Sequence, residues 1–325
     1  MKQLIQHKLK TNIIGRTGHV MGYGQYVKKS SPLVNIDLHA GQSNSDEAVS
    51  GDTVAALSEL GVPNPAYSEA PHPGKTLTNW YNSGGAQEFS IDTDPQIAVV
   101  TLVHDGAGNA TLTGGAGVFN QYDAKVRIII EGSTTTEWNG VYTNTQGSPT
   151  NILKFQVPIT HTTTATGTIT VRRAGMWEAF ASDIKTQTDL GKYVNVRHFH
   201  WMQGNGNAQA ATVAQYAFFR EFIKYIKEAV HTELGVLENV TIDRNFIITV
   251  GLTAQHLTAI TDPDELHEVR RYQIDACRHL PYAVYVESID FNRADGVHIT
   301  DINAFKSRAI QASISRTNYT NLTGK

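Results

Sequence analysis

The residues of this chain that could carry out chemistry lie in two short segments, one near each end. Gly41-Gln42-Ser43-Asn44 follows an apolar run, and Asp295-Gly296-Val297-His298 lies near the C-terminus. A serine hydroxyl becomes an effective nucleophile only when a base takes its proton, and a third group must hold that base in one tautomer. Ser43, His298 and Asp295 supply these three chemical types. The two segments therefore predict a Ser-His-Asp triad whose Asp and His, three residues apart, share a single turn.

A third segment, Trp201-Met202-Gln203-Gly204-Asn205, lies between these two in the chain. In this order the three segments resemble the GQSN, W-x-Q-G-E and D-x-x-H blocks of the SGNH (GDSL) hydrolase superfamily. Within it they are most similar to the branch of sialate O-acetylesterases and acetyl xylan esterases. The resemblance implies a carbohydrate O-acetylesterase that needs no cofactor. Ser43 would attack the ester carbonyl, His298 would act as base and then as acid, and Asp295 would orient His298.

Acyl transfer also needs hydrogen-bond donors fixed around the tetrahedral oxyanion, and loss of one typically costs about 3–4 kcal/mol of transition-state stabilisation. The resemblance implies that these donors are the backbone N–H of Ser43, the backbone N–H of Gly84 or Gly85, and the side-chain amide of Gln203. Substrate contacts would come from Gln42, Asn44, Trp201 and Asn205. A tryptophan at the end of a strand is, alternatively, a packed core residue.

Asn205 stands where the family pattern has glutamate, and Asn207 stands where aspartate is frequent. An amide cannot supply the charge of a carboxylate, so this departure bears on efficiency and substrate range. It also leaves a second interpretation open, in which the site is inactive and the protein binds glycans as a structural or adhesion component of a virion.

The three segments follow runs that are typical of buried strands. These runs cover residues 33–39, 193–201 and 282–287, and a further strand is predicted at 246–250. Apolar residues at helical spacing predict a helix over 213–230. Strands that alternate with helices predict a parallel sheet covered on both faces, and ligands bind at the carboxyl ends of its strands. The family resemblance implies the same fold, a flavodoxin-like three-layer α/β/α sandwich.

The composition changes to Thr, Gly, Val and Ile between residues 87 and 175, where short strand-like runs alternate with Gly- and Asn-rich turns. This pattern predicts an antiparallel β-sandwich, Ig-like or carbohydrate-binding-like, inserted into the hydrolase domain. Its segments resemble small β-domains of phage tail and fibre proteins. The predicted organisation is an N-terminal arm (1–30), the hydrolase domain (31–86 and 176–325) and the insertion (87–175).

Bulk properties exclude several classes of function. A net charge of −3 and a pI near 6.5 argue against nucleic-acid binding through bulk charge. A single cysteine, Cys277, excludes an intrachain disulfide. The sequence contains no run of about 18 apolar residues, so it predicts no membrane span. Its first ten residues lack the apolar region of a secretion signal.

The localisation expected from these features is synthesis in the cytoplasm followed by a place in a phage virion, with bacterial surface polysaccharide as the substrate. The expected partners are other virion proteins, which would bind through the N-terminal arm or the inserted β-domain. Association with further copies of this chain is a second expectation. The alternative is an intracellular esterase without a virion role.

His198 and His200 lie two residues apart on a predicted strand, so both side chains face the same way and could bind a metal. No Asp, Glu or His cluster with a recognisable spacing accompanies them in the sequence. The sequence therefore predicts a metal-independent enzyme in which these histidines are core or site-lining residues.

Overall fold

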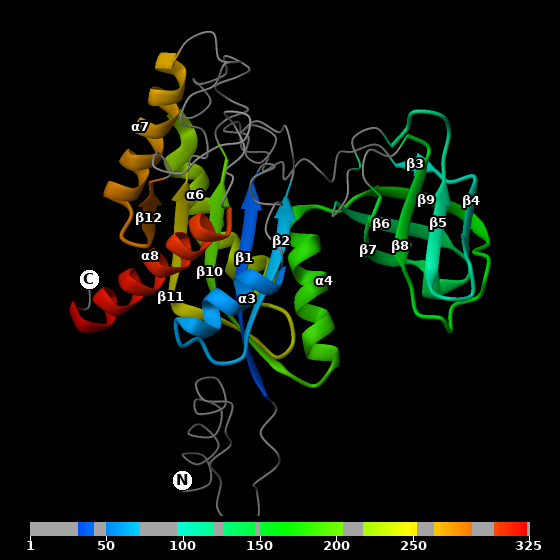
Figure 1. Ribbon diagram of the computed structural model, residues 1–325, viewed down its shortest axis with the longest axis horizontal. Coiled ribbons are helices and arrows are strands. Elements are labelled where there is room, and N and C mark those ends of the chain that lie inside the picture. Colours follow the sequence, from blue (N-terminus) through cyan, green and yellow to red (C-terminus); the bar gives the residue numbers. More distant parts are fainter. Residues whose placement is uncertain are drawn as a thin grey trace, which may run out of the picture. The chain divides into compact units, whose positions relative to one another are not determined.

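The structure is a computed structural model that describes residues 32–41, 50–71, 96–119, 122, 126–146, 150–203, 217–251, 263–287 and 302–323 (Figure 1). The chain divides into two compact units. The first, here the α/β unit, comprises Met1–Glu69 and Phe180–Lys325, and the second, here the β unit, comprises Ala70–Ala179. The predicted arm at residues 1–30 lies outside the described residues, as do residues 72–95, so the predicted boundary at residue 87 stays a prediction.

The α/β unit is built on a five-stranded sheet. Its strands are β1 (Leu33–Gly41), β2 (Pro65–Pro71), β10 (Tyr193–Met202), β11 (Val240–Gly251) and β12 (Ala283–Val286). Their order in the sheet is β12-β11-β10-β1-β2, and the pairs β1/β10, β10/β11 and β11/β12 are parallel. Figure 1 shows β2 running in the same direction as β1. With the β unit set aside, this is the flavodoxin-like order 2-1-3-4-5, which confirms the predicted fold class.

Helices cover both faces of this sheet. Helices α3 (Ser50–Glu59) and α8 (Ile302–Thr323) pack against each other on one face, where α8 contacts β11 and β12. On the other face, Phe180 of α4 (Met176–Asp189) packs edge-on against Phe199, and Phe222 of α6 (Phe219–Ala229) packs against Trp201. Helix α6 continues as a π-helical turn over Val230–Leu234, and α7 (Pro263–His279) packs against it. None of the helices within these described ranges is long and apolar enough to span a bilayer.

A register irregularity in β10 decides which of its side chains reach which face. Ile36 pairs with Val196, but the next residue of β1, Asp37, pairs with His198, so Arg197 is an extra residue in β10. Because successive side chains of a strand point to opposite faces of the sheet, one extra residue moves every later side chain of that strand to the other face. Phe199 and Trp201 therefore join the apolar face, and His198 and His200 share the face of Asp37.

The β unit has a hydrophobic core of its own between two antiparallel sheets. One sheet has the order β3-β9-β6-β7, with β3 (Ile97–Ala98), β9 (Gly167–Arg173), β6 (Arg127–Ser133) and β7 (Gly140–Thr143). The other has the order β4-β5-β8, with β4 (Thr101–His104), β5 (Asn109–Thr113) and β8 (Ile152–Gln156). Buried residues from both sheets pack into one cluster that includes Leu112, Ile130, Trp138, Phe155 and Val171. This is the predicted antiparallel β insertion.

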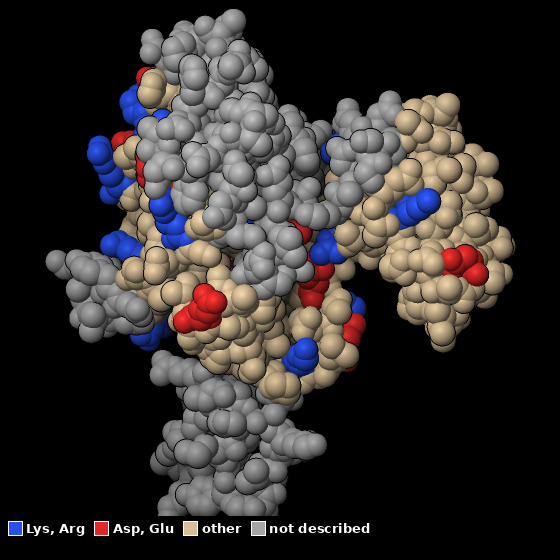
Figure 2. Space-filling model, viewed as in Figure 1, with Lys and Arg blue, Asp and Glu red and all other residues tan. Residues whose placement is uncertain are grey.

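Charged side chains of both signs lie on the face shown in Figure 2, with several Lys and Arg groups along the left side of the α/β unit and few charges of either sign on the β unit.

Gly41 ends β1 in a conformation that other residues avoid. Its φ is +137°, and a Cβ built there would lie 2.0 Å from the backbone oxygen of Met202. Only glycine allows β1 and β10 to approach this closely at their carboxyl ends.

Substitution Gly41→Ala is expected to lower the free energy of unfolding by about 3 kcal/mol or more, because it combines backbone strain with a clash against backbone. Gly61→Ala is the matched control: Gly61 also has a positive φ, +79°, but open space around its Cβ position. That variant is expected to lose only about 1–2 kcal/mol. Urea denaturation followed by circular dichroism measures both, and equal losses would contradict the steric explanation.

Candidate active site at the carboxyl edge of the sheet

The strand order of the α/β unit reverses between β1 and β10. From β1 the chain goes to β2 on one side, and β10, β11 and β12 then follow on the other. Loops that leave such a switch point separate in opposite directions and leave a crevice, which is where ligands bind in open α/β sheets. The last residues of the two strands, Gly41 and Met202, pair directly with each other. Gln42 and Gln203 are the next residues in the chain after these paired strand ends.

The third segment belongs to a connection that starts at the same edge. Strand β12 runs parallel to β11 and ends at Val286, and α8 begins at Ile302. Asp295 and His298 lie in the chain between these two elements. All three segments thus belong to connections that start at the carboxyl ends of parallel strands.

Most of the predicted site residues lie outside the described residues. This applies to Gln42, Ser43, Asn44, Gly84, Gly85, Asn205, Asp295 and His298. The triad, the oxyanion donors and most substrate contacts therefore stay predictions. Trp201 and Gln203 are described, and both are fully buried.

Trp201 packs as a core residue of the apolar face. Its ring lies 6.4 Å from the ring of Phe199, nearly parallel to it, and 4.7 Å from the ring of Phe222. With no exposed surface, Trp201 supports the end of β10 from within, which is the alternative that the sequence left open.

Gln203 is held by a neighbour on α7. Its backbone oxygen accepts a hydrogen bond of 2.7 Å from Nε2 of Gln273, which is also fully buried. This bond fixes the first residue after β10, and therefore the start of the second segment. The side-chain amide of Gln203 is the predicted donor to the oxyanion, and such a donor must be held in place before the charge develops.

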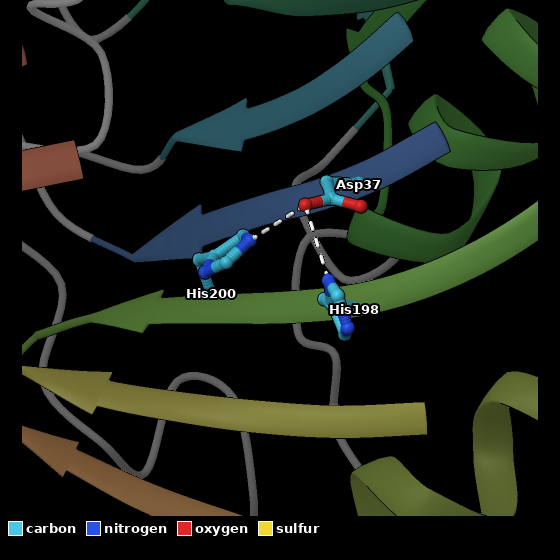
Figure 3. A group of neighbouring side chains, drawn as sticks. All are labelled: Asp37, His198 and His200. Atoms are coloured by element: carbon cyan, nitrogen blue, oxygen red, sulfur yellow. Dashed lines mark hydrogen bonds and ion pairs between the residues drawn. The ribbon is translucent and has the colours of Figure 1, made fainter. Parts of the chain in front are cut away.

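A buried polar cluster lies on the opposite face of β1 and β10 (Figure 3). Oδ2 of Asp37 lies 3.3 Å from Nδ1 of His198 and 3.2 Å from Nε2 of His200. The ring of His39 lies 4.4 Å from the ring of His200. None of these four side chains has more than 2% of its residue surface exposed. The donor atoms of Asp37, His198 and His200 all lie within 4.8 Å of one another, a spacing that suits a metal ion.

Burial and neighbouring charges shift the pKa values of Asp37, His39 and His200, with a different balance of causes for each. Burial opposes ionisation of Asp37, yet His198 and His200 hold the pKa of its carboxyl well below the usual value through charge and hydrogen bonds. Burial lowers the pKa of His200 even though Asp37 acts in the other direction. Burial, with His200 and Lys306 nearby, lowers the pKa of His39 well below its usual value. These shifts favour the ionised form of Asp37 and the neutral form of His39.

Sequence reasoning paired His198 with His200 but missed Asp37 and His39. The available signal was the alternation Asn35, Asp37, His39 in an otherwise apolar strand, which places three polar side chains on one face. The pairing register and the irregularity at Arg197 bring them together, and neither can be read from the sequence.

Two further features bear on function. Burial raises the pKa of the Cys277 thiol to about 12, which makes that cysteine inert as a nucleophile. The β unit has an open hollow of about 440 Å³ over β4, β5 and β8, lined by polar residues that include Asp105, Asn109, Lys154 and Gln156.

The α/β unit is thus a flavodoxin-like α/β protein with a candidate site at the topological switch point. No protein-family model and no curated protein sequence matches the chain. Similar solved structures include a peptidoglycan O-acetylesterase, at 10% identity and a TM-score of 0.36, covering 98% of this chain and 96% of that one. A carbohydrate acetylesterase from Xanthomonas citri is 10% identical, with a TM-score of 0.44 and coverage of 87% of this chain and 56% of that one.

A protein from Arabidopsis thaliana is 8% identical, with a TM-score of 0.41 and coverage of 89% of this chain and 98% of that one. None of these likenesses is close enough to assign an activity to this chain, so its function must be inferred from its own residues.

Substitution Gln273→Met is expected to lower the free energy of unfolding by about 1–3 kcal/mol, because the buried oxygen of Gln203 loses its donor while the side-chain volume is kept. Gln311→Met, at an exposed position of α8, is the control and is expected to change stability little. Urea denaturation of the two variants in parallel measures the difference. An unchanged stability for Gln273→Met would show that the bond does not hold the end of β10.

Proposed function

We propose that this protein is a serine esterase that removes O-acetyl groups from carbohydrate. Ser43 is the nucleophile, His298 the general base and acid, and Asp295 the carboxylate that orients His298. These residue types supply what ester hydrolysis by a serine requires.

One observation carries the proposal: Gly41 and Met202 pair at the carboxyl ends of β1 and β10, where the strand order reverses. Ser43 is two residues beyond Gly41, and Gln203 is the residue after Met202. The two segments, which are about 160 residues apart in sequence, therefore follow strand ends that pair with each other. This pairing at the end of the sheet where topology predicts ligand binding supports the proposal.

The proposed reaction has two halves. Ser43 Oγ attacks the acetyl carbonyl as His298 takes its proton, and the tetrahedral oxyanion is bound by the backbone N–H of Ser43, a glycine N–H at Gly84 or Gly85, and the amide of Gln203. The intermediate then expels the sugar hydroxyl, which receives the proton from His298. A water molecule, activated by His298, next attacks the acetyl-serine and releases acetate. No cofactor takes part in these steps.

The substrate class follows from the family resemblance, with bacterial surface polysaccharide as the proposed carrier of the acetyl groups. The hollow over β4, β5 and β8 offers amide, carboxylate and ammonium groups to sugar hydroxyls. Asn205, where the family pattern has glutamate, supports a second candidate function, a glycan-binding protein whose site turns over slowly or not at all.

The decisive measurement is hydrolysis of p-nitrophenyl acetate by the wild type and by Ser43→Ala. Loss of the nucleophile is expected to lower kcat/KM by at least about 10³-fold, because only the oxyanion donors and binding remain. Ser58→Ala, an exposed serine of α3 in the same unit, is the matched control and is expected to retain full activity.

Equal rates for wild type and Ser43→Ala would remove Ser43 as nucleophile and favour the glycan-binding candidate. Wild-type activity that disappears in Ser43→Ala and persists in Ser58→Ala would justify a screen of acetylated polysaccharides by acetate release.

Substitution Asp295→Asn tests the second half of the triad separately. It is expected to lower kcat by roughly 10⁴-fold with little change in KM, because an amide favours the wrong tautomer of the base while substrate binding is kept. Steady-state kinetics with p-nitrophenyl acetate measure this, and a change confined to KM would show that Asp295 binds substrate instead.

A further inference from the structure

We propose that Asp37, His198 and His200 bind a divalent transition metal ion of the zinc class inside the α/β unit (Figure 3). This site lies on the face of the sheet covered by α8 and is independent of the proposed esterase mechanism.

The distances in the cluster fit metal ligands better than hydrogen bonds. Charge-assisted N–H···O bonds to a carboxylate measure about 2.7–2.9 Å. Both histidine nitrogens lie farther than this from Asp37 Oδ2, at 3.3 Å for His198 Nδ1 and 3.2 Å for His200 Nε2. Two ligand atoms at about 2.0 Å from a tetrahedral zinc ion lie about 3.3 Å from each other. The two distances from Asp37 Oδ2 are therefore those between neighbouring corners of a zinc tetrahedron, and the two histidine nitrogens lie within 4.8 Å of each other.

The outer nitrogens of both histidines are held by threonine hydroxyls. Nδ1 of His200 lies 2.6 Å from Oγ1 of Thr249 on β11, and Nε2 of His198 lies 3.3 Å from Oγ1 of Thr317 on α8. Metal-binding histidines are typically oriented in this way, by a partner on the nitrogen that does not bind the metal. The arrangement turns Nε2 of His200 and Nδ1 of His198 toward the same oxygen of Asp37 (Figure 3). Nδ1 of His198 also lies 3.1 Å from Oγ of Ser313 on α8, so this hydroxyl lies beside the proposed ion.

His39 provides an independent indication of a ligand. It is fully buried, and neither of its ring nitrogens has a hydrogen-bond partner among the described residues; the same holds for Oδ1 of Asp37. Leaving such atoms unpaired is costly, because they lose their hydration on burial and gain no hydrogen bond in return. His39 is two residues from Asp37 on the same face of β1 and opposite His200 in the register, with its ring 4.4 Å from the ring of His200, so its unpartnered nitrogens lie beside the proposed ligands.

The chemistry of the donor atoms suits a cation. A fully buried carboxylate such as Asp37 is stabilised by positive charge beside it, and a metal ion would add its charge to the effect of the two histidines. The buried ammonium of Lys306 on α8 lies 4.0 Å from the carboxylate of Glu69. Imidazole and carboxylate ligands without thiolate suit zinc and its neighbours in the first transition series.

A metal here would be structural. The ligands come from β1 and β10, and the residues that orient them come from β11 and α8. A closed, fully buried site with protein ligands contributes to folding, since the ion binds the folded chain and not the unfolded one. Chelator added to the folded protein would reach such an ion slowly.

The test unfolds the purified protein in guanidinium with chelator and refolds it with Co²⁺ or without metal. We expect about one cobalt ion per wild-type chain by mass spectrometry, the absorption of tetrahedral cobalt, and a higher melting temperature than for metal-free protein. Ser43→Ala is expected to behave as wild type, so failure of this proposal and failure of the esterase proposal are distinguishable.

Two variants make the assignment specific. His200→Gln is expected to lose the ion, and Thr249→Val, which removes only the orienting hydroxyl, is expected to weaken binding by roughly 10–100-fold in competition with a chelator. Thr241→Val, on the same strand at an exposed position, is the control and is expected to bind as wild type. A wild type that refolds without taking up cobalt would overturn the proposal, as would equal cobalt affinity in Thr249→Val. If His200→Gln fails to fold, cobalt uptake by the wild type and the cobalt affinity of Thr249→Val still test the proposal.

Discussion

Strands β1 and β10 pair in parallel from Leu33 with Tyr193 to Gly41 with Met202, and this pairing determines both sites of the α/β unit. At its carboxyl end, the contact between Gly41 and the Met202 backbone is so close that only glycine fits. That contact holds together the two strand ends that precede the proposed nucleophile and amide segments. Midway along the pair, the extra residue at Arg197 turns His198 and His200 toward Asp37. A shift of the register by one residue would separate both sets of groups.

The two faces of this sheet differ in what holds their helices. On one face, Phe180, Phe199, Trp201 and Phe222 are fully buried and pack ring against ring, so burial of apolar surface holds α4 and α6 there. On the other face, α8 combines apolar and polar contacts: Phe305 packs with Met202 and Val286, and Ser313 and Thr317 both lie within hydrogen-bonding distance of His198. Buried polar contacts of this kind are directional and become costly when a partner is missing.

The β unit does not depend on these contacts, because its core is complete within its own two sheets. Trp138 illustrates this: it is fully buried, its indole N–H donates to Thr162, and its ring packs edge-on against His161. An insertion with a self-contained core can be accommodated in a loop of another domain without disturbing its sheet. This explains how the α/β unit keeps the uninterrupted flavodoxin-like order around it.

The sequence alone determined the fold class. The alternation of strands and helices and the change of composition at the insertion could be recognised because local patterns are written in neighbouring residues. Strand β2 and helix α8 were not predicted, and the serine, amide and Asp-His segments stay predictions. The sequence also marked His198 and His200 as facing the same way. Tertiary structure alone decided that Asp37 and His39 lie against them and that Trp201 belongs to the core. The physical reason is that these contacts depend on strand order, register and one extra residue in β10, which follow from packing between segments about 160 residues apart.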